Sequence, residues 1–214
     1  MSLAELEQVA REVSGCTRCP LHRGRTQSVP GEGPPGAEIV FIGEAPGYNE
    51  DRTGRPFVGQ AGRLLEDLLA SIGLKRSDVF ICNVVKCRPA NNRDPYPAEI
   101  EACRPYLDRQ LAAIQPRLVV TLGRYSMARY IPGESISRVH GQARRVGETW
   151  VLPMFHPAAA LHKEQYRSLL QQDFGRIPAL LDRVRAGTAA AAASPDPAPV
   201  EPAPPPAQQM PLFE

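Results

Sequence analysis

Short apolar runs alternate with amphipathic stretches along most of this chain. Four apolar runs predict buried strands at residues 38–43, 79–85, 118–122 and 150–154. Apolar side chains at helical spacing predict helices over residues 3–14, 64–72, 97–111 and 163–184, and a short helix is expected to open at Gly123. Strands that alternate with helices favour an α/β fold, a three-layer sandwich around a central four-stranded, mostly parallel sheet.

The polar residues that could carry chemistry follow three of the four predicted strands. Glu44 and Glu50 come after the first strand, Asn83 lies in the second, and His156 follows the fourth. Right-handed crossovers would bring these strand ends to one edge of the sheet. Because ligands bind at the carboxyl edge of open α/β sheets, the sequence predicts one active site assembled from residues that are far apart in the chain.

The loop from Gly43 to Gly62 is expected to form one wall of that site. Its glycines allow the backbone to approach a ligand, and Pro46 stiffens the first turn. An aromatic residue, Phe57, stands among glycines just before a helix begins. Carboxylates at the carboxyl end of a strand are better explained by chemistry than by solubility.

Composition changes at residue 187 and divides the chain in two. Residues 1–186 have the size of one domain with a single core. Residues 188–206 are nearly all Ala and Pro and cannot bury a core, so we expect a disordered tail over residues 187–214. The tail ends in an apolar tip that contains Gln209, Met210, Leu212 and Phe213.

The composition and the N-terminus favour a cytoplasmic protein but do not indicate a binding partner. No apolar run approaches the ~20 residues of a membrane span. The N-terminus lacks the basic region of a signal peptide, so a cytoplasmic protein is the default expectation. The formal net charge of +2 is too small to indicate nucleic acid by itself. Candidate phosphate contacts, each with a solvated basic surface as the alternative, are Arg138, Arg144, Arg145, Lys163 and Arg167.

Four of the five cysteines have a spacing that suits a metal centre. Cys16 and Cys19 form a C-x2-C pair, and Cys87 and Cys103 are separated by fifteen residues. Four thiolates from separate elements can hold a [4Fe–4S] cluster or a structural zinc ion, and the spacing alone does not decide between them. Buried free thiols are the third alternative. Cys82 lies inside an apolar run and is interpreted as a core residue.

Taken in order, these motifs resemble the family 4 uracil-DNA glycosylases, the iron–sulfur group of bacteria and archaea. The resemblance covers about residues 10–184. It is carried by residues 43–47 with Glu50-Asp51, by residues 54–59, by Asn83 ahead of Lys86-Cys87-Arg88-Pro89, by the four cysteines and by His156-Pro157-Ala158. The resemblance implies a uracil-DNA glycosylase-like fold and a [4Fe–4S] cluster on the four cysteines. It also implies a monomeric repair enzyme that hydrolyses the N-glycosidic bond of deoxyuridine in DNA and leaves an abasic site.

The resemblance also implies a role for each candidate residue around a base taken out of the helix. Phe57 would stack on the base. Asn83 would offer a donor and an acceptor to its Watson–Crick edge. His156 would hydrogen-bond the uracil O2 and stabilise the anionic leaving group.

The remaining roles concern water, the pocket wall and the DNA stack. Glu44 is the first choice for the residue that activates water, and Glu50 is the second, better suited to orienting Asn92 or His156. Leu161 is a possible wedge in the emptied stack, with a helical first turn as the alternative. Ala45 departs from the family pattern, because many members carry Gly there, and its methyl group would narrow the pocket.

Two further motifs and two rival functions complete the sequence analysis. The tip of the tail resembles the short peptide by which bacterial repair proteins bind the replication sliding clamp. A related branch forms a covalent adduct through a histidine after the second strand, but residues 86–94 contain none. The rivals to the enzyme are a non-catalytic iron–sulfur nucleic-acid-binding module of the same fold and a nucleotide-binding protein with a zinc knuckle. The second is weakened because the chain has neither a Gly-x-Gly-x-x-Gly motif nor a P-loop.

Overall fold

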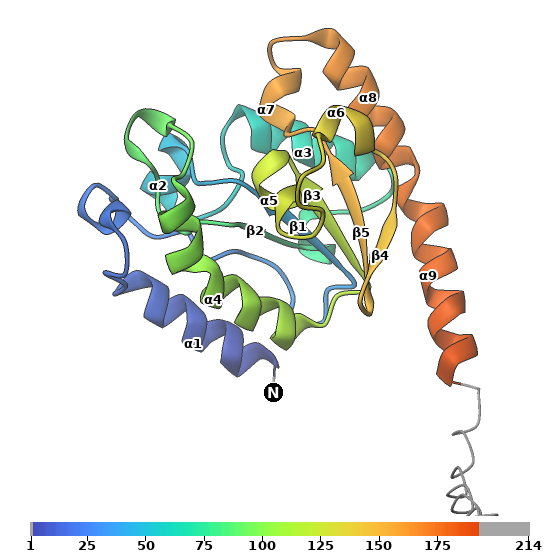
Figure 1. Ribbon diagram of the computed structural model, residues 1–214, viewed down its shortest axis with the longest axis horizontal. Helices are drawn as coiled ribbons and strands as arrows, with labels where there is room; N and C mark the ends of the chain where they lie inside the picture. Colours follow the sequence, from blue (N-terminus) through green and yellow to red (C-terminus); the bar gives the residue numbers. More distant parts are fainter. Residues whose placement is uncertain (1, 193–214) are drawn as a thin grey trace, which may run out of the picture.

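A five-stranded sheet in the order β2-β1-β3-β5-β4 forms the centre of the molecule. The structure is a computed structural model and describes residues 2–192 of the 214-residue chain (Figure 1). Four strands are parallel: β1 (Ile39–Gly43), β2 (Phe80–Asn83), β3 (Leu118–Leu122) and β5 (Thr149–Met154). They confirm the four strands expected from the apolar runs.

The fifth strand, β4 (Arg144–Val146), was not predicted. It pairs antiparallel with β5 at the edge of the sheet. Two of its three residues are arginines, and its side chains are exposed or half-buried. A strand of this length and polarity has no apolar run or alternation by which the sequence could reveal it. The sheet is therefore mostly parallel with one short antiparallel edge.

Helices cover both faces of the sheet, because side chains alternate between faces along each strand. Ile39 and Phe41 of β1 belong to a core with residues of α3 (Gln60–Ser71), α8 (Glu164–Gly175) and α9 (Ile177–Ala192). Val40 and Ile42 face the other way, into a core with residues of α1 (Ser2–Ser14) and α4 (Pro97–Ile114). Figure 1 shows α1 and α4 side by side on this face. The three-layer sandwich expected from the sequence is confirmed.

Several short elements lie in the connections. The helices α2 (Tyr48–Thr53) and α7 (Pro157–Ala160) follow β1 and β5, and α5 (Arg124–Ala128) follows β3. The others are α6 (Ile136–Val139) and the 3-10 turns η1 (Pro20–Arg23), η2 (Arg76–Asp78) and η3 (Ala90–Asn92). Within residues 2–192, none of the helices combines the length and the apolar character needed to cross a bilayer.

The C-terminal part of the described chain differs from the single helix expected over residues 163–184. Two helices, α8 and α9, meet at Arg176. Pro178 explains the break, because proline has no backbone N–H and is tolerated only in the first turn of a helix. Helix α9 continues to Ala192, past the expected boundary at residue 186. The tail tip lies outside the described residues.

Candidate active site

A cavity of about 360 Å³ lies at the carboxyl edge of the parallel strands and gathers most of the candidate residues. Gly43 at the end of β1 is paired in register with Asn83 at the end of β2. His156 follows β5 and caps α7. The candidates that line the cavity are Glu44, Ala45, Glu50, Phe57, Asn83, Asn92 and His156. The expected convergence of the strand ends is therefore present in the structure.

Phe57 lies in the wall of the cavity with an unusual backbone conformation. Its φ of 51° is in the left-handed region, and its ring stacks on the His156 imidazole with centroids 5.5 Å apart. A Cβ atom on Gly43 would collide with this ring and with the Asn83 amide, so a side chain at position 43 would displace two residues that line the cavity. The ring is 5% exposed and packs partly in the main core, so it is both a core aromatic and a wall of the cavity.

The carboxylate of Glu50 accepts hydrogen bonds from backbone amides rather than from Asn92 or His156, the partners expected from the sequence. Its Oε1 accepts hydrogen bonds from the amides of Val58 and Gly59 at 2.9 Å, and its Oε2 accepts from Gly47 at 3.1 Å. Asn92 accepts a hydrogen bond from Arg88 Nε at 2.7 Å instead. Because backbone amides use both of its oxygens, Glu50 is a residue that shapes the loop.

Asp51 has a comparable structural task. Its carboxylate is 2% exposed and accepts two hydrogen bonds from the amide of Thr26, at 2.9 and 3.1 Å. It thus ties α2 to the loop that follows the first cysteine pair.

Asn83 carries a buried polar atom without a partner in the described structure. The residue is 2% exposed and lines the cavity, and its Oδ1 makes no hydrogen bond. A buried amide oxygen without a partner is unfavourable by about 1–3 kcal/mol, so such atoms are rare unless a ligand completes them. Because Asn83 lines the cavity, its unpartnered amide makes the cavity a candidate binding site for a ligand with a hydrogen-bond donor.

A hydrogen bond to the ring of His156 determines which of its nitrogens carries the proton. Its Nδ1 accepts from the amide of Ala158 at 3.1 Å, so the proton of the neutral ring resides on Nε2. Burial lowers the pKa of His156 to about 4, although the negative charge of Glu50 acts in the opposite direction. The imidazole is therefore a neutral N–H donor at physiological pH.

Glu44 lines the same cavity, and its pKa is shifted. Burial, and next the neighbouring Asp94, raise the pKa of Glu44 to about 7, while Arg124 acts against this rise. Arg124 forms an ion pair with Asp94. A carboxyl group with a pKa close to neutrality can exchange a proton with a substrate or a water molecule. Sequence reasoning missed Asp94 and Arg124, since neither lies next to a recognised motif residue.

Lys86 is a third residue whose contribution the sequence did not reveal. It is 1% exposed, and its Nζ donates to the carbonyl of Asn83 at 2.9 Å and to Gln110 Oε1 at 2.6 Å. Gln110 in turn donates to the carbonyl of Pro30 at 2.7 Å. This buried side chain fixes the end of β2 against α4. Its position directly after the apolar pair Val84-Val85 was the available signal of burial.

Leu161 and the basic candidates lie outside the cavity. Leu161 ends α7 and packs, half-buried, against the main core. Arg144, Arg145 and Arg167 form ion pairs with Glu134, Glu148 and Glu164. Their role as phosphate contacts stays a prediction. His140 pairs with the buried Asp173 at 2.8 Å and does not line the cavity.

The four candidate metal ligands line one small hollow between α1 and α4. Cys16 and Cys19 lie in the loop after α1, Cys87 follows β2, and Cys103 is in α4. Burial raises the pKa of the Cys103 thiol to about 11 and also raises those of Cys19 and Cys87. Cys82 is fully buried in β2, as expected. Within residues 2–192, no group of three or more His, Cys, Asp or Glu side chains is arranged to hold a metal ion.

Three of these sulfur atoms accept hydrogen bonds. Arg25 donates to Cys87 at 3.2 Å, and the backbone amides of Lys86 and Arg18 donate to Cys103 at 3.3 Å and to Cys16 at 3.5 Å. Hydrogen bonds of this kind stabilise thiolates. Ala45 packs against the same cysteine cluster while it lines the cavity, so the two sites share a wall.

Comparisons with known proteins agree on one family. The profile of the "Uracil DNA glycosylase superfamily" matches residues 30–175. A protein of Sulfurisphaera tokodaii named type-4 uracil-DNA glycosylase is 52% identical, over 80% of this chain and 83% of its own length. Proteins of the same name from Archaeoglobus fulgidus and Thermotoga maritima are 49% and 43% identical, over 82% and 83% of this chain and 92% and 95% of theirs.

Proposed function

The chain belongs to the uracil DNA glycosylase superfamily and, within it, to the type-4 enzymes, and from this premise we propose that it removes uracil from DNA. The reaction is hydrolysis of the N-glycosidic bond of deoxyuridine, which releases uracil and leaves an abasic site. The buried, unpartnered amide oxygen of Asn83 in the wall of the cavity carries this proposal, because it matches the imide N–H of an extruded uracil. A non-catalytic module of the same fold is not favoured, because its relatives carry the names of enzymes.

We propose that the extruded base enters the cavity between Phe57 and the end of β2. The Phe57 ring offers it a stacking surface. The Asn83 amide offers hydrogen bonds to its edge, and the pattern of donor and acceptor distinguishes uracil from cytosine. The cavity volume of about 360 Å³ is ample for one pyrimidine ring. Ala45 limits the cavity on the side of the cysteine cluster.

Bond cleavage makes uracil an anion and the sugar cationic, and two residues respond to this change. His156 presents its Nε2–H as a neutral donor to the uracil O2, on which negative charge develops. Glu44 in its ionised form orients a water molecule and accepts its proton as the water attacks the sugar carbon. Glu50 keeps the loop between them in place through the amides of Gly47, Val58 and Gly59.

A uracil-containing oligonucleotide tests this function directly. Incubation with the protein and then with alkali is expected to cut the strand at the position of the uracil, whereas a thymine control stays intact. An uncut strand, under conditions in which a known uracil-DNA glycosylase cuts it, excludes the enzyme and favours a binding module.

The pH dependence of the reaction tests the role of Glu44. Since its pKa is raised to about 7 and the general base must be ionised, kcat is expected to increase as the pH rises through 7 and then to level off. His156 is neutral across this range because its pKa is lowered to about 4, so it adds no second step. Single-turnover rates between pH 5.5 and 9 measure the profile.

The variant Glu44→Gln serves as the comparison for that profile. It keeps the size of the side chain and removes its ionisation, so the step near pH 7 is expected to disappear and the rate to fall about 100-fold. A profile that falls as the pH rises through 7, or one that Glu44→Gln leaves unchanged, contradicts the role as a base.

We propose that the four cysteines hold a [4Fe–4S] cluster. In such a cluster each thiolate binds one of four irons, so the ligands surround the group rather than share one ion. The sulfur atoms of Cys16, Cys19, Cys87 and Cys103 come from three segments around one hollow. Those of Cys16, Cys87 and Cys103 accept hydrogen bonds from N–H donors, as thiolates of a cluster do. When bound, the cluster supplies a brace between the loop after α1, the end of β2 and α4.

Removal of one ligand tests the cluster. Cys87→Ala is expected to abolish the brown colour and the iron content of the purified protein and to lower its melting temperature, because a ligand of the brace is lost. Cys82→Ala is the matched control, since it also removes a buried thiol, from the strand that leads to Cys87. Zinc in place of iron, or equal iron in Cys87→Ala, contradicts the assignment.

We propose that the tail tip binds the replication sliding clamp. Support comes from the apolar series Met210, Leu212 and Phe213 after an Ala/Pro-rich tether. Immobilised full-length protein is expected to retain purified clamp, and a chain truncated after residue 206 is expected to lose it. If the full-length and the truncated protein retain equal amounts of clamp, this proposal is wrong.

A cytoplasmic location and a monomeric state also stay predictions.

A further inference from the structure

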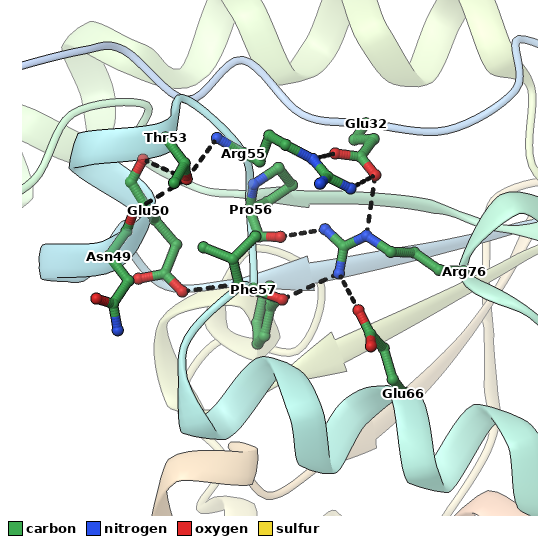
Figure 2. A network of polar contacts seen from close by, with 10 residues as sticks. Glu32, Asn49, Glu50, Thr53, Arg55, Pro56, Phe57, Glu66 and Arg76 are labelled. Carbon is green, nitrogen blue, oxygen red and sulfur yellow. Dashed lines mark hydrogen bonds and ion pairs between the residues drawn. The ribbon is translucent and has the colours of Figure 1, made fainter.

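A charged network outside the cavity holds the loop that presents Phe57 to it. Arg76 lies in the turn η2 ahead of β2, and its guanidinium group points at this loop (Figure 2). Its Nη1 donates to the carbonyl of Phe57 at 3.0 Å, and its Nη2 donates to the carbonyl of Pro56. The Arg76 side chain is 14% exposed and does not line the cavity, so its contacts serve the loop rather than a ligand.

Two carboxylates hold the guanidinium group of Arg76 in position. Its Nε donates to Glu32 at 2.9 Å, and its Nη1 also reaches Glu66 at 3.2 Å. Arg55 donates two hydrogen bonds to Glu32, and the pKa of Glu32 falls to about 2, chiefly through Arg55 and then Arg76. The backbone of Glu32 exchanges two hydrogen bonds with Ile81 of β2, so the network is attached to the sheet.

The peptide between Phe57 and Val58 is held at both ends by charged side chains. Its carbonyl accepts from Arg76, and its amide donates to Glu50 Oε1 at 2.9 Å. Figure 2 shows these two side chains on opposite sides of the loop. A left-handed conformation is unfavourable for an L-residue with a side chain, so the loop needs such restraints to keep the φ of 51° at Phe57. Hydrogen bonds to charged groups are strong enough to supply them.

We propose that Arg76 is a positioning residue for base recognition. Together with Glu50 it fixes the plane of the Phe57–Val58 peptide, and this plane determines where the Phe57 ring stands beside His156. Arg76 therefore acts on the extruded uracil through the ring and without touching the base. The inference rests on the proposed function and adds to it a residue that no motif of the site contains.

Inhibition by free uracil measures this role more directly than turnover does. Stacking of a base on an aromatic side chain contributes ~1–3 kcal/mol, so a displaced ring is expected to raise the inhibition constant of uracil ~10-fold in Arg76→Met. The fall in kcat/KM is expected to be of similar size. Arg55→Met is the matched control, because it removes the other arginine from Glu32 but no bond to a loop carbonyl. It is expected to change the inhibition constant less than ~2-fold.

A double-mutant cycle separates positioning from a general loss of stability. If Arg76 acts through the ring, Arg76→Met is expected to change the inhibition constant less than ~2-fold once Phe57→Ala is present. The inference is overturned if wild type and Arg76→Met have equal inhibition constants. It is also overturned if Arg76→Met raises the inhibition constant by the same factor with and without Phe57→Ala. If Arg76→Met does not fold, Arg76→Lys takes its place, and the same results support or overturn the inference. Lysine keeps the positive charge beside Glu32 but cannot donate to the carbonyls of Pro56 and Phe57 at the same time.

The wild-type protein distinguishes this inference from the proposed function. A wild type that does not release uracil overturns the proposed function itself. A wild type that releases uracil, with Arg76→Met equally inhibited by free uracil, overturns only the role of Arg76.

Discussion

Replacement of His156 by alanine is expected to lower kcat ~10²–10³-fold, the usual effect of deleting a donor to developing negative charge. His156 lines the cavity, and its ring carries the proton on Nε2 because Nδ1 accepts from the amide of Ala158. The ring is neutral because burial lowers its pKa to about 4. KM is expected to change little, since a neutral donor gains strength only as the leaving uracil becomes an anion. Single-turnover kinetics on a uracil-containing duplex measure the rate.

The control for this prediction is His162→Ala, which removes an exposed histidine six residues away. Loss of the cap on α7 costs His156→Ala about 1 kcal/mol of stability, so rates are compared well below the melting temperature. A decrease of only about twofold, or a decrease that His162→Ala shares, removes His156 from the chemistry.

Asn83→Ala is expected to lower kcat/KM ~10²–10³-fold, because a site built to hydrogen-bond its ligand loses both the donor and the acceptor at once. In contrast to His156→Ala, the change is expected to weaken inhibition by free uracil as well, since these hydrogen bonds already form in the ground state. Uracil inhibition constants and kcat/KM, measured on the same preparations, separate the two residues.

Thr121→Val provides a matched control on the neighbouring part of the sheet. Thr121 in β3 also has a buried side-chain oxygen without a hydrogen bond in the described structure, but it does not line the cavity. We expect its replacement to leave uracil release within about twofold of wild type. An Asn83→Ala protein that is as active as Thr121→Val contradicts a role of the amide in recognition.

The assembly of the site could be predicted from the order of its strands. Parallel strands end at the same edge of a sheet, so Glu44, Asn83 and His156 had to meet once the four apolar runs were interpreted as β1, β2, β3 and β5. The cysteine pairs were likewise visible in their spacing, and the structure brings all four to one hollow. These features depend on patterns that recur along the chain.

The division of labour between the carboxylates could not be predicted in this way. Glu50 was considered for catalysis, but its oxygens bind the amides of Val58 and Gly59, which depends on the path of the loop rather than on residue type. The raised pKa of Glu44 depends first on burial and next on Asp94, fifty residues later in the chain. Lys86 and Arg76 act through buried or half-buried contacts that only the tertiary structure defines.

The same limit explains the differences in the fold. Strand β4 is formed because the polar segment Arg144–Val146 finds a partner in β5, not because of its own composition. Sequence patterns thus reveal the elements that bury apolar side chains. They do not reveal polar segments and charges whose partners come from elsewhere in the chain.

The structure of the protein with bound uracil tests the central claim most directly. We expect the base in the cavity at the carboxyl edge of β1, β2 and β5, stacked on the Phe57 ring, with its edge hydrogen-bonded to Asn83 and its O2 to His156 Nε2. Uracil bound elsewhere, or a cavity that stays empty at a concentration of uracil that inhibits the enzyme, contradicts the account.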